Sequence, residues 1–462
     1  MAARAPVPQG RLAAAMLAGA LVLVEFLAGM QRYLSQTVLP LVAAELDGAH
    51  LYGPLDAAAQ APMFLMMPVG AWLLSRYRVG RLMVVLTLVT VAGAVLCATA
   101  VTMEAFVIGT AVRALAAGAL ATIGMGAISR GLPPRYRQLV LAAMSGVWVF
   151  SSVLGPVYAV AATAAFGWRW AMVLYLPLLL VARAMVARSM PERTEPVAPE
   201  PAPWAWSIVL ATGSAVLALP LGAWSAVALV VGGGLMLRSS VAVLPAGTLG
   251  ATSGRRAALT ALMATAAVYF GATMVLSVVA HDAFGLDAER FGLVIGASGF
   301  MWAVTGLWTG SHPAGDDGAF RRRMVGGGAA ITAGVVGLLA TTVAADGPGA
   351  AFVGLLVAAG VTGAGMGLLY PDLLGRCLAH PDVDDGISED RMAAAVVVAE
   401  SVGLAVATTA AYAWLGTGLG LADAPLLRAQ VLYAVLTALA VLMVVRLTLA
   451  GRVAAARAPT AA

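Results

Sequence analysis

Lysine is absent from this sequence, and charged residues of any kind occupy only 11% of its 462 positions. A soluble globular protein carries about 25% charged residues, so the scarcity of charge argues against a water-soluble fold. All 27 basic residues are arginine, which indicates a GC-rich genome. The net charge of +5 does not predict a nucleic-acid partner, because most of the arginines lie on one side of the predicted membrane crossings.

Cysteine and catalytic motifs are equally sparse. Cys97 and Cys377 are the two cysteines, one in an apolar run and one near a charged loop, so no disulfide framework is expected. No glycine-rich nucleotide loop is followed by lysine, and the four histidines are scattered without metal-ligand spacing. We therefore expect no enzyme, no ATP-driven pump, no metal site and no cofactor.

Long apolar runs are what the sequence has in abundance, with 61% hydrophobic residues and a mean hydropathy of +0.93. A bilayer core of roughly 30 Å needs about 20 helical residues. Fourteen stretches qualify or nearly so: 12–42, 57–75, 82–102, 105–129, 138–163, 168–187, 204–220, 222–237, 257–280, 291–310, 324–344, 350–374, 392–415 and 427–447. The sequence thus predicts an all-α, polytopic membrane protein.

Arginine positions predict the orientation of these crossings. With the N-terminus inside, 22 of the 27 arginines fall in inner loops or tails, and the outer loops carry mostly acidic residues. Cytoplasmic loops of membrane proteins are enriched in arginine and lysine. We therefore expect a multi-pass protein of the bacterial cytoplasmic membrane with both termini in the cytoplasm.

Composition also divides the chain into segments. A proline-rich linker, 189–203, follows six predicted crossings (1–188), and a second linker, 238–256, precedes another six (257–462). Between the linkers, 204–237 has 34 residues for two crossings, with Leu219-Pro220-Leu221-Gly222 as a tight outer turn. Two short spans are the favoured interpretation of this segment, and a re-entrant hairpin is the alternative.

Four short motifs, in order along the chain, carry a family resemblance. They are the loop with Gly70, Ser75, Arg76, Gly80 and Arg81, the run Arg113-Ala114-Leu115-Ala116-Ala117-Gly118, the run Ser151 to Gly155-Pro156, and Trp168-Arg169-Trp170. They resemble the conformational-lock loop, the Arg-x-x-Gln-Gly element, the antiporter motif and the sixth-helix opening of the major facilitator superfamily, specifically its 14-helix drug:proton antiporter branch in high-GC bacteria. Ser75 stands where that branch has aspartate, and Ala117 where it has glutamine.

The resemblance implies two six-helix bundles with two extra helices between them. It also implies a monomeric secondary transporter that exports amphipathic or cationic small molecules by alternating access, driven by protons and a proton gradient. The alternative is a facilitator or flippase-like transporter of a lipid or an anionic or zwitterionic metabolite. A receptor or scaffold is a third class, but it would need large folded loops that the sequence lacks.

Charged residues within the predicted crossings are the candidate functional groups: Glu25, Arg32, Arg113 and Glu400. A charge at mid-bilayer costs at least ~2.5–3.5 kcal/mol, so such residues normally face the bundle interior and pair. The branch's usual helix-1 acid is replaced by Gln31, with Glu25 six residues earlier. We predict that Glu25 and Glu400 titrate and that Arg113 holds one of them ionised; a permanent structural ion pair is the alternative.

The predicted substrate cavity follows from side chains that share helix faces. Helix 1 contributes a polar stripe, helix 2 a polar and methionine-rich face, and the later half an opposing wall: Gln31, Arg32, Gln36, Gln60, Met63, Met67, Tyr269, Met301 and Trp302. Plain packing is the alternative for the methionines. Gly155-Pro156 predicts a bend that either flexes or is static, and the acidic loop from Asp382 to Asp390 is expected to be solvated.

Overall fold

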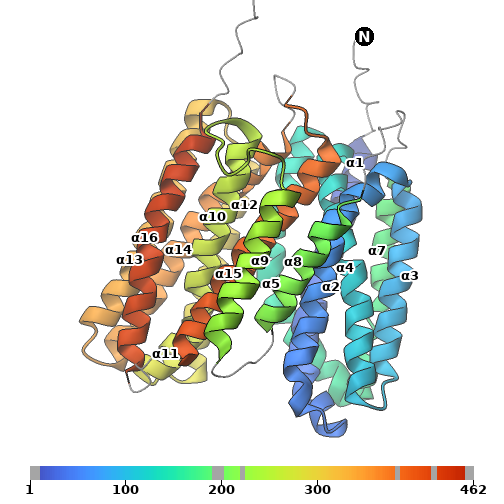
Figure 1. Ribbon diagram of the computed structural model, residues 1–462, viewed down its shortest axis with the longest axis horizontal. Coiled ribbons are helices and arrows are strands. Elements are labelled where there is room, and N and C mark those ends of the chain that lie inside the picture. The colour runs from blue at the N-terminus through green and yellow to red at the C-terminus, as the bar shows by residue number, and fades with distance from the viewer. Residues whose placement is uncertain (1–10, 190–201, 219–223, 380–384, 418–423, 453–462) are drawn as a thin grey trace, which may run out of the picture.

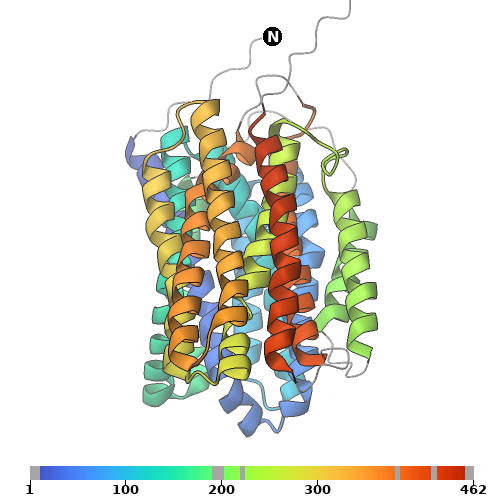
Figure 2. The ribbon, with the colours of Figure 1, turned by 90° about the vertical axis from the view of Figure 1, so that its left-hand side faces the viewer.

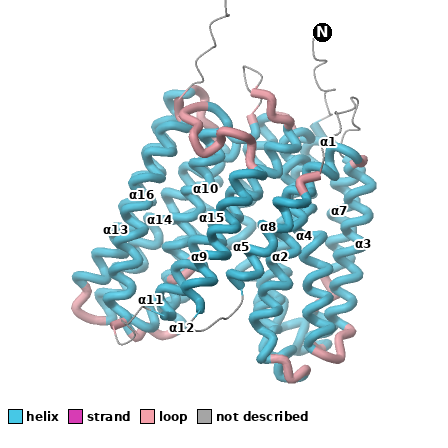
Figure 3. The backbone as a smooth tube through the Cα atoms, viewed as in Figure 1, coloured by secondary structure: helices cyan, strands magenta, loops and turns pink. Residues whose placement is uncertain are grey.

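The computed structural model describes residues 11–189, 202–218, 224–379, 385–417 and 424–452. The described chain is helical and contains no β-strand (Figure 3). The N-terminal half consists of α1 (Arg11–Glu45), the short 3₁₀ helix η1 (Ala49–Leu51), α2 (Tyr52–Arg76), α3 (Val79–Ala98), α4 (Met103–Gly131), α5 (Pro134–Phe166), α6 (Trp168–Ala171) and α7 (Leu176–Ser189). The pair α8 (Trp204–Ala218) and α9 (Ser225–Val243) follows. The C-terminal half consists of α10 (Gly254–Thr273), α11 (Leu276–Phe284), α12 (Ala288–Ser311), α13 (Asp317–Ala344), α14 (Pro348–Leu378), α15 (Glu389–Thr417) and α16 (Pro425–Ala450).

Twelve spans in the described residues are long and apolar enough to cross a membrane. Two further apolar stretches, Leu154–Phe166 in α5 and Trp204–Ala218, are shorter. At 1.5 Å per residue, the 15 residues of α8 reach roughly 22 Å, less than the ~30 Å bilayer core. The count of fourteen crossings expected from the sequence is therefore not supported, whereas the all-helical, polytopic architecture is confirmed.

Two expected continuous crossings are broken near one end. The stretch 168–187 divides into α6 and α7, and the stretch 257–280 divides into α10 and α11. In each case a tyrosine from a neighbouring helix donates a hydrogen bond to a backbone oxygen at the break: Tyr158 to Ala171 O at 2.9 Å, and Tyr412 to Met274 O at 2.7 Å. A break in an apolar helix is tolerated when its freed backbone groups find partners of this kind.

The two halves stand side by side, with α8 and α9 in front of the gap between them (Figure 1). Turned by 90°, the pair lies along one edge of the bundle (Figure 2). Helix α8 packs against α2 of the N-terminal half, and α9 packs against α15 of the C-terminal half. The halves touch each other directly through α5 with α12 and through α15 with α2 and α4.

Glycine allows some helices to approach at backbone distance. A Cβ atom on Gly118 of α4 would lie 2.1 Å from the carbonyl oxygen of Met63 in α2, and one on Gly363 of α14 would lie 2.0 Å from that of Ser298 in α12. No other residue fits at these positions without moving a helix. In lipid, where helices gain little hydrophobic energy from association, such close van der Waals packing is a main source of stability.

One end of the bundle is named the arginine-rich end. It is the end at which α1 begins and α2 ends, and the helix ends and loops there carry Arg76, Arg78, Arg81, Arg135, Arg321 and Arg322. The free thiols of Cys377 and Cys97 are both fully buried. Cys377 lies one residue before the C-terminal end of α14, at the arginine-rich end, and Cys97 lies in the last turn of α3, at the opposite end of the bundle.

Candidate functional site

Two of the predicted proton-titrating residues, one from each half, lie within electrostatic range of each other. The hydroxyl of Tyr370 in α14 donates to both carboxylate oxygens of Glu400 in α15, at 2.9 and 3.0 Å. Glu25 of α1, in the other half, lies close enough to interact electrostatically with both Glu400 and Tyr370. Residues 375 positions apart in sequence therefore form one acidic group between the halves, and Tyr370 is a member that the sequence analysis missed.

Aromatic rings connect this acidic group to the interior of the C-terminal half. Trp302 packs edge-on against Tyr370 at 5.6 Å between ring centroids, and against Tyr269 at 5.2 Å. Phe270 joins the same cluster, 5.1 Å from Tyr269, whose hydroxyl shares a 2.9 Å hydrogen bond with Ser298. Among the described atoms, the buried Trp302 Nε1 has no hydrogen-bond partner. Two predicted wall residues, Tyr269 and Trp302, thus lie beside the carboxylates.

The predicted stripe on α1 separates into different surroundings. Gln31 is half-buried and accepts a 2.7 Å hydrogen bond from the Tyr175 hydroxyl of the N-terminal half. Arg32 is exposed, next to Tyr33, and the side chain of Gln36 lies outside the described residues. The stripe therefore has two different surroundings. Glu25 lies near the acidic group, whereas Gln31 lies in the interior of the N-terminal half.

The predicted face of α2 lies mainly against α4. Met67 is 2% exposed, and its carbonyl oxygen accepts a 2.7 Å hydrogen bond from Thr122. Met63 is half-buried and passes Gly118 at backbone distance, while Gln60 bonds Asp56 one turn away at 2.8 Å. These contacts are the helix packing that the sequence analysis gave as the alternative.

Met301 is half-buried and packs toward α14, with its Cγ 3.7 Å from a Cβ built on Gly360. It therefore adjoins the same α12–α14 contact as Trp302. Among the predicted wall residues of the later half, only Tyr269 and Trp302 stack in the aromatic cluster beside the acidic group.

Arg113 lies in the interior of the N-terminal half, 8% exposed, and makes no hydrogen bond or ion pair with any described residue. It is packed against Gly93 of α3 and lies within electrostatic range of Tyr175. The pairing with a carboxylate expected from the sequence is thus not observed within the described chain. Arg183, one of the 22 arginines counted from the sequence with the inner loops or tails, is instead a buried residue of α7, because α7 extends to Ser189.

The predicted conformational motifs lie at helix contacts. A Cβ on Gly70 would lie 2.8 Å from Thr122 Cβ, and one on Gly80 would lie 3.6 Å from a carbonyl oxygen of α7. Ser75 bonds Trp72 O at 2.8 Å, Arg76 stacks on the Trp72 ring, and Arg81 is exposed. Helix α5 continues through Pro156, and Gly155 brings it against Met30 and Tyr33 of α1.

At the arginine-rich end, ionic and polar contacts bridge the two halves. Arg130 at the end of α4 pairs with Asp390 at the start of α15 at 2.9 Å, and Asp390 is 4% exposed. Arg137 Nη1 of α5 donates to Leu378 O of α14 at 3.0 Å. These contacts join the two halves at the arginine-rich end, and we call them the inner latch. Asp390 was expected to be solvated, and the structure corrects this because α15 packs against α4 and Asp390 is buried.

The loop that carries the latch is held by a second ion pair. Arg255 at the start of α10 donates to Asp385, with 2.8 Å between Nε and Oδ2. Burial alone would raise the pKa of Asp385, but Arg255, the Ile387 N–H and nearby Arg256 outweigh it and hold that pKa below its usual range. The expectation that Asp385 is simply solvated is therefore also wrong.

The C-terminal half has its own ion pairs at this end. Arg323 of α13 pairs with the buried Asp372 of α14 at 2.6 Å, and Arg376 pairs with Asp317. These pairs join α13 to α14 within one half. They are therefore distinct from the latch, which joins one half to the other.

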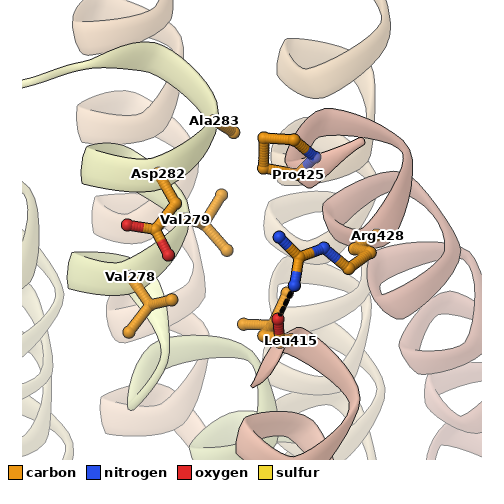
Figure 4. Close-up of a pocket in the computed structure, with 7 residues that line it drawn as sticks. All are labelled: Val278, Val279, Asp282, Ala283, Leu415, Pro425 and Arg428. Atoms are coloured by element: carbon orange, nitrogen blue, oxygen red, sulfur yellow. Dashed lines mark hydrogen bonds between the residues drawn. The ribbon is translucent and has the colours of Figure 1, made fainter. Parts of the chain in front are cut away.

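A small surface pocket lies at the opposite end, between α11, α15 and α16 (Figure 4). Asp282 and Arg428 face it from opposite sides, and Arg428 donates to the carbonyl oxygen of Leu415. The neighbouring His281 pairs with Asp282 at 2.8 Å and is exposed. This pocket contains none of the residues of the acidic group.

Comparison with known proteins assigns the family. The model of the Major Facilitator Superfamily matches residues 21–377. The chain belongs to the major facilitator superfamily. Its members are transporters, and the family model covers the helices from α1 to α14.

Solved superfamily members share the fold at low identity. The human organic anion transporter MFSD10 (TETRAN) superposes with a TM-score of 0.67 at 15% identity, covering 95% of this chain and 100% of that one. The proton:xylose symporter XylE gives 0.63 at 12% identity, covering 94% and 95%. A bacterial homologue of the iron transporter ferroportin, in an outward-facing state, gives 0.65 at 11% identity, covering 93% and 98%.

One curated relative is similar in part of its sequence. The efflux pump FUS6 of Gibberella moniliformis (strain M3125 / FGSC 7600) is 27% identical over 159 residues. The matched region is 34% of this chain and 28% of that protein, so the chain spans well under a third of the relative's length.

Proposed function

We propose that this superfamily member exports amphipathic small molecules in exchange for protons, and that Glu25, Glu400 and Tyr370 form the coupling site. The observation that carries the proposal is the acidic group itself, in which Glu25 of one half faces Glu400 and Tyr370 of the other. Intramembrane carboxylates that face the bundle interior are typical of proton pathways.

Electrostatics gives this arrangement a means of coupling. Two carboxylates within range repel each other when both are ionised, and the repulsion is strong in an apolar site. A proton on either one removes that repulsion, and so changes the free energy of bringing α1 and α15 together. In alternating access the halves rock against each other around a midplane site, so a proton bound between them biases one state over the other.

The contacts of the inner latch support assigning this structure to an outward-facing state. The polar contacts of Arg130 with Asp390 and of Arg137 with Leu378 O close the arginine-rich end. The arginine distribution supports placing that end, and both termini, in the cytoplasm of a bacterial cell. In this arrangement protons reach the acidic group from outside and leave after the latch opens.

We further propose the 14-helix architecture of the drug:proton antiporter branch, with α5 and α8 as additional crossings. Helix α5 has 33 residues. Exposed Trp204 and Trp206 lie at one end of the α8–α9 pair and exposed Trp224 at the other, as expected of residues at the two membrane interfaces. A short span such as α8 can be accommodated by local thinning of the bilayer. The organisation into residues 1–188, 204–237 and 257–462, joined by linkers, and a monomeric state complete the proposal.

The test is transport of two amphipathic ions of opposite charge, ethidium and 1-naphthalenesulfonate, into proteoliposomes with an imposed pH gradient. The wild-type protein should accumulate at least one of them only when the gradient is present, and Glu400→Gln and Glu25→Gln should abolish that dependence. Glu289→Gln is the matched control, because Glu289 is exposed at the start of α12. Gradient-independent movement in the wild type would contradict proton coupling, and an unchanged Glu400→Gln variant would remove Glu400 from the site.

A second function is favoured by a different observation. The buried Arg113 and Arg183, with no acidic partner among the described residues, suit a cargo that carries negative charge. A transporter of a lipid or of an anionic or zwitterionic metabolite is therefore the alternative.

A further inference from the structure

A second polar cluster lies inside the N-terminal half, between α1, α3, α4 and α7. At its centre the Tyr175 hydroxyl donates to Gln31 Oε1 at 2.7 Å. Both Arg113 and Arg183 lie within electrostatic range of Tyr175, one from α4 and one from α7, which begins one residue after Tyr175. Arg183 Nη1 reaches Thr90 of α3 at 3.0 Å. We call Gln31, Thr90, Arg113, Tyr175 and Arg183 the arginine cluster.

The two arginines of this cluster are buried without a counter-ion in the described chain. Each is 8% exposed, and the Nε atom of each is buried and lacks a hydrogen-bond partner among the described residues. Neither forms an ion pair with a described carboxylate, and the oxygens that Arg183 contacts belong to the neutral Thr87 and Thr90.

Other deeply placed arginines of the molecule are compensated. Arg255 has Asp385, Arg130 has Asp390, and Arg323 has Asp372. Burying a charge is costly unless it is paired, and two like charges near one tyrosine add repulsion to that cost. The arginine cluster is therefore an uncompensated positive site among compensated ones.

We propose that the arginine cluster binds the anionic group of the transported molecule, a carboxylate, sulfonate or phosphate. The planar guanidinium donates along two parallel directions and matches the paired oxygens of these groups. The half-buried Gln31 lies on α1, the helix that also carries Glu25, so one helix contributes to both the cluster and the coupling site. The inference rests on the proposed transport function and names its cargo class: an amphiphile with an anionic group, either a lipid headgroup or a soluble organic anion.

The division of charge also separates the two sites. The acidic group at Glu25 and Glu400 takes up protons, and the arginine cluster, confined to one half, holds the cargo's negative charge. A cation would meet two uncompensated arginines in the cluster and be repelled by them.

The experiment is equilibrium binding to purified protein in nanodiscs of phosphatidylcholine, without any pH gradient. The probes are 1-naphthalenesulfonate and 1-naphthylmethylammonium, which share a ring system and differ in the sign of their charge. We expect the sulfonate to bind at least tenfold more tightly than the ammonium. Arg113→Gln and Arg183→Gln should each weaken sulfonate binding at least tenfold, while Arg238→Gln, an exposed arginine stacked on Trp206, should leave it unchanged.

Two further sets of measurements control for misfolding and identify the source of the anion. Arg113→Lys and Arg183→Lys retain the charge that the fold accommodates, so they should fold like the wild type and keep part of the affinity. Nanodiscs containing phosphatidylglycerol identify the source of the anion, because a lipid-headgroup site would be occupied and sulfonate binding would fall, whereas a site for soluble anions would be unaffected. Either lipid result supports an anion site.

Equal or weaker binding of the sulfonate relative to the ammonium would overturn the inference, as would sulfonate binding that survives both glutamine substitutions. The proposed coupling function fails separately. Glu400→Gln should lose gradient-driven transport yet bind the sulfonate with unchanged affinity, since Glu400 is not part of the arginine cluster.

Discussion

The Tyr370 hydroxyl lies almost equally far from the two carboxylate oxygens of Glu400, at 2.9 and 3.0 Å. The tyrosine thus holds the carboxylate symmetrically. We expect Tyr370→Phe, which keeps the ring against Trp302 but removes the donor, to reduce gradient-driven transport about tenfold. A hydrogen bond to a charged group contributes ~1.5 kcal/mol or more, which corresponds to that factor. Phe270→Leu, a change in the same aromatic cluster but away from Glu400, is the control, and equal losses in both variants would attribute the effect to packing.

The inner latch predicts a change in the accessibility of a native cysteine. In a Cys97→Ala background, Cys377 is the single thiol, fully buried one residue before the latch acceptor Leu378. Asp390→Asn should open the arginine-rich end and raise the rate of Cys377 alkylation at least about tenfold, because losing one member of a buried pair costs ~3 kcal/mol or more.

Arg376→Gln provides the matched control for this measurement. It breaks the Arg376–Asp317 pair at the same end of the molecule but within one half, so the alkylation rate should stay at the background value. Reversing the pair, with Arg130→Asp and Asp390→Arg together, should restore part of the protection. An alkylation rate that Asp390→Asn leaves unchanged would show that the pair does not hold the halves together.

The contact between α2 and α4 predicts opposite results for two glycines of one helix. Gly118→Ala places a Cβ 2.1 Å from the Met63 carbonyl oxygen, whereas a Cβ on Gly124 meets nothing within 4 Å. Overpacking typically costs ~1–3 kcal/mol, so Gly118→Ala should lower the free energy of unfolding by about that amount. Gly124→Ala should be neutral or stabilise by up to ~1 kcal/mol. Thermal unfolding in detergent measures both, and equal effects would refute the close approach.

A contact at the end opposite the arginine-rich end predicts a dependence of stability on pH. The indole N–H of Trp168 and the guanidinium of Arg169 bond Glu45 and hold its pKa below the usual range. Because the folded-state pKa is depressed, the stabilisation is present above the unfolded value, roughly 4.3, and is lost as the pH falls through the folded value. The effect should be small, since the Glu45 side chain is 49% exposed.

Comparison of melting temperatures checks this expectation. Glu45→Gln should melt below the wild type at pH 7, and the difference should shrink toward zero as the pH is lowered below 4. A difference that stays constant with pH would mean that the carboxylate charge does not contribute.

Apolar length and isolated charge were sufficient to predict much of the fold and part of the site. Continuous runs of about 20 apolar residues correspond to helices, because a spanning segment must satisfy its backbone internally. Glu25 and Glu400 could be chosen as candidate functional residues, because a charge within an apolar run is energetically costly and usually has a functional role. Their proximity could not be derived, since it depends on how the two halves are oriented.

Other features left no signal in the sequence. Tyr370 and Tyr175 look like ordinary apolar-run residues, and their roles come from which helix they face. Arg183 resembles a loop arginine, because hydropathy does not separate the last turns of a helix from the loop that follows. The breaks closed by Tyr158 and Tyr412 depend on hydrogen bonds from other helices, which no local pattern contains.

The pair α8 and α9 has a mechanical consequence for the transport cycle. Each helix is fastened to a different half, so any rocking of the halves must pass through the contact between the two. At that contact a Cβ on either Gly213 or Gly232 would lie 2.8 Å from the other glycine's carbonyl oxygen, so the two backbones approach directly, with the side chains of Leu217 and Met236 packed beside them. Such close packing resists separation of the two helices. We therefore expect the pair to act as a tether that limits how far the halves swing.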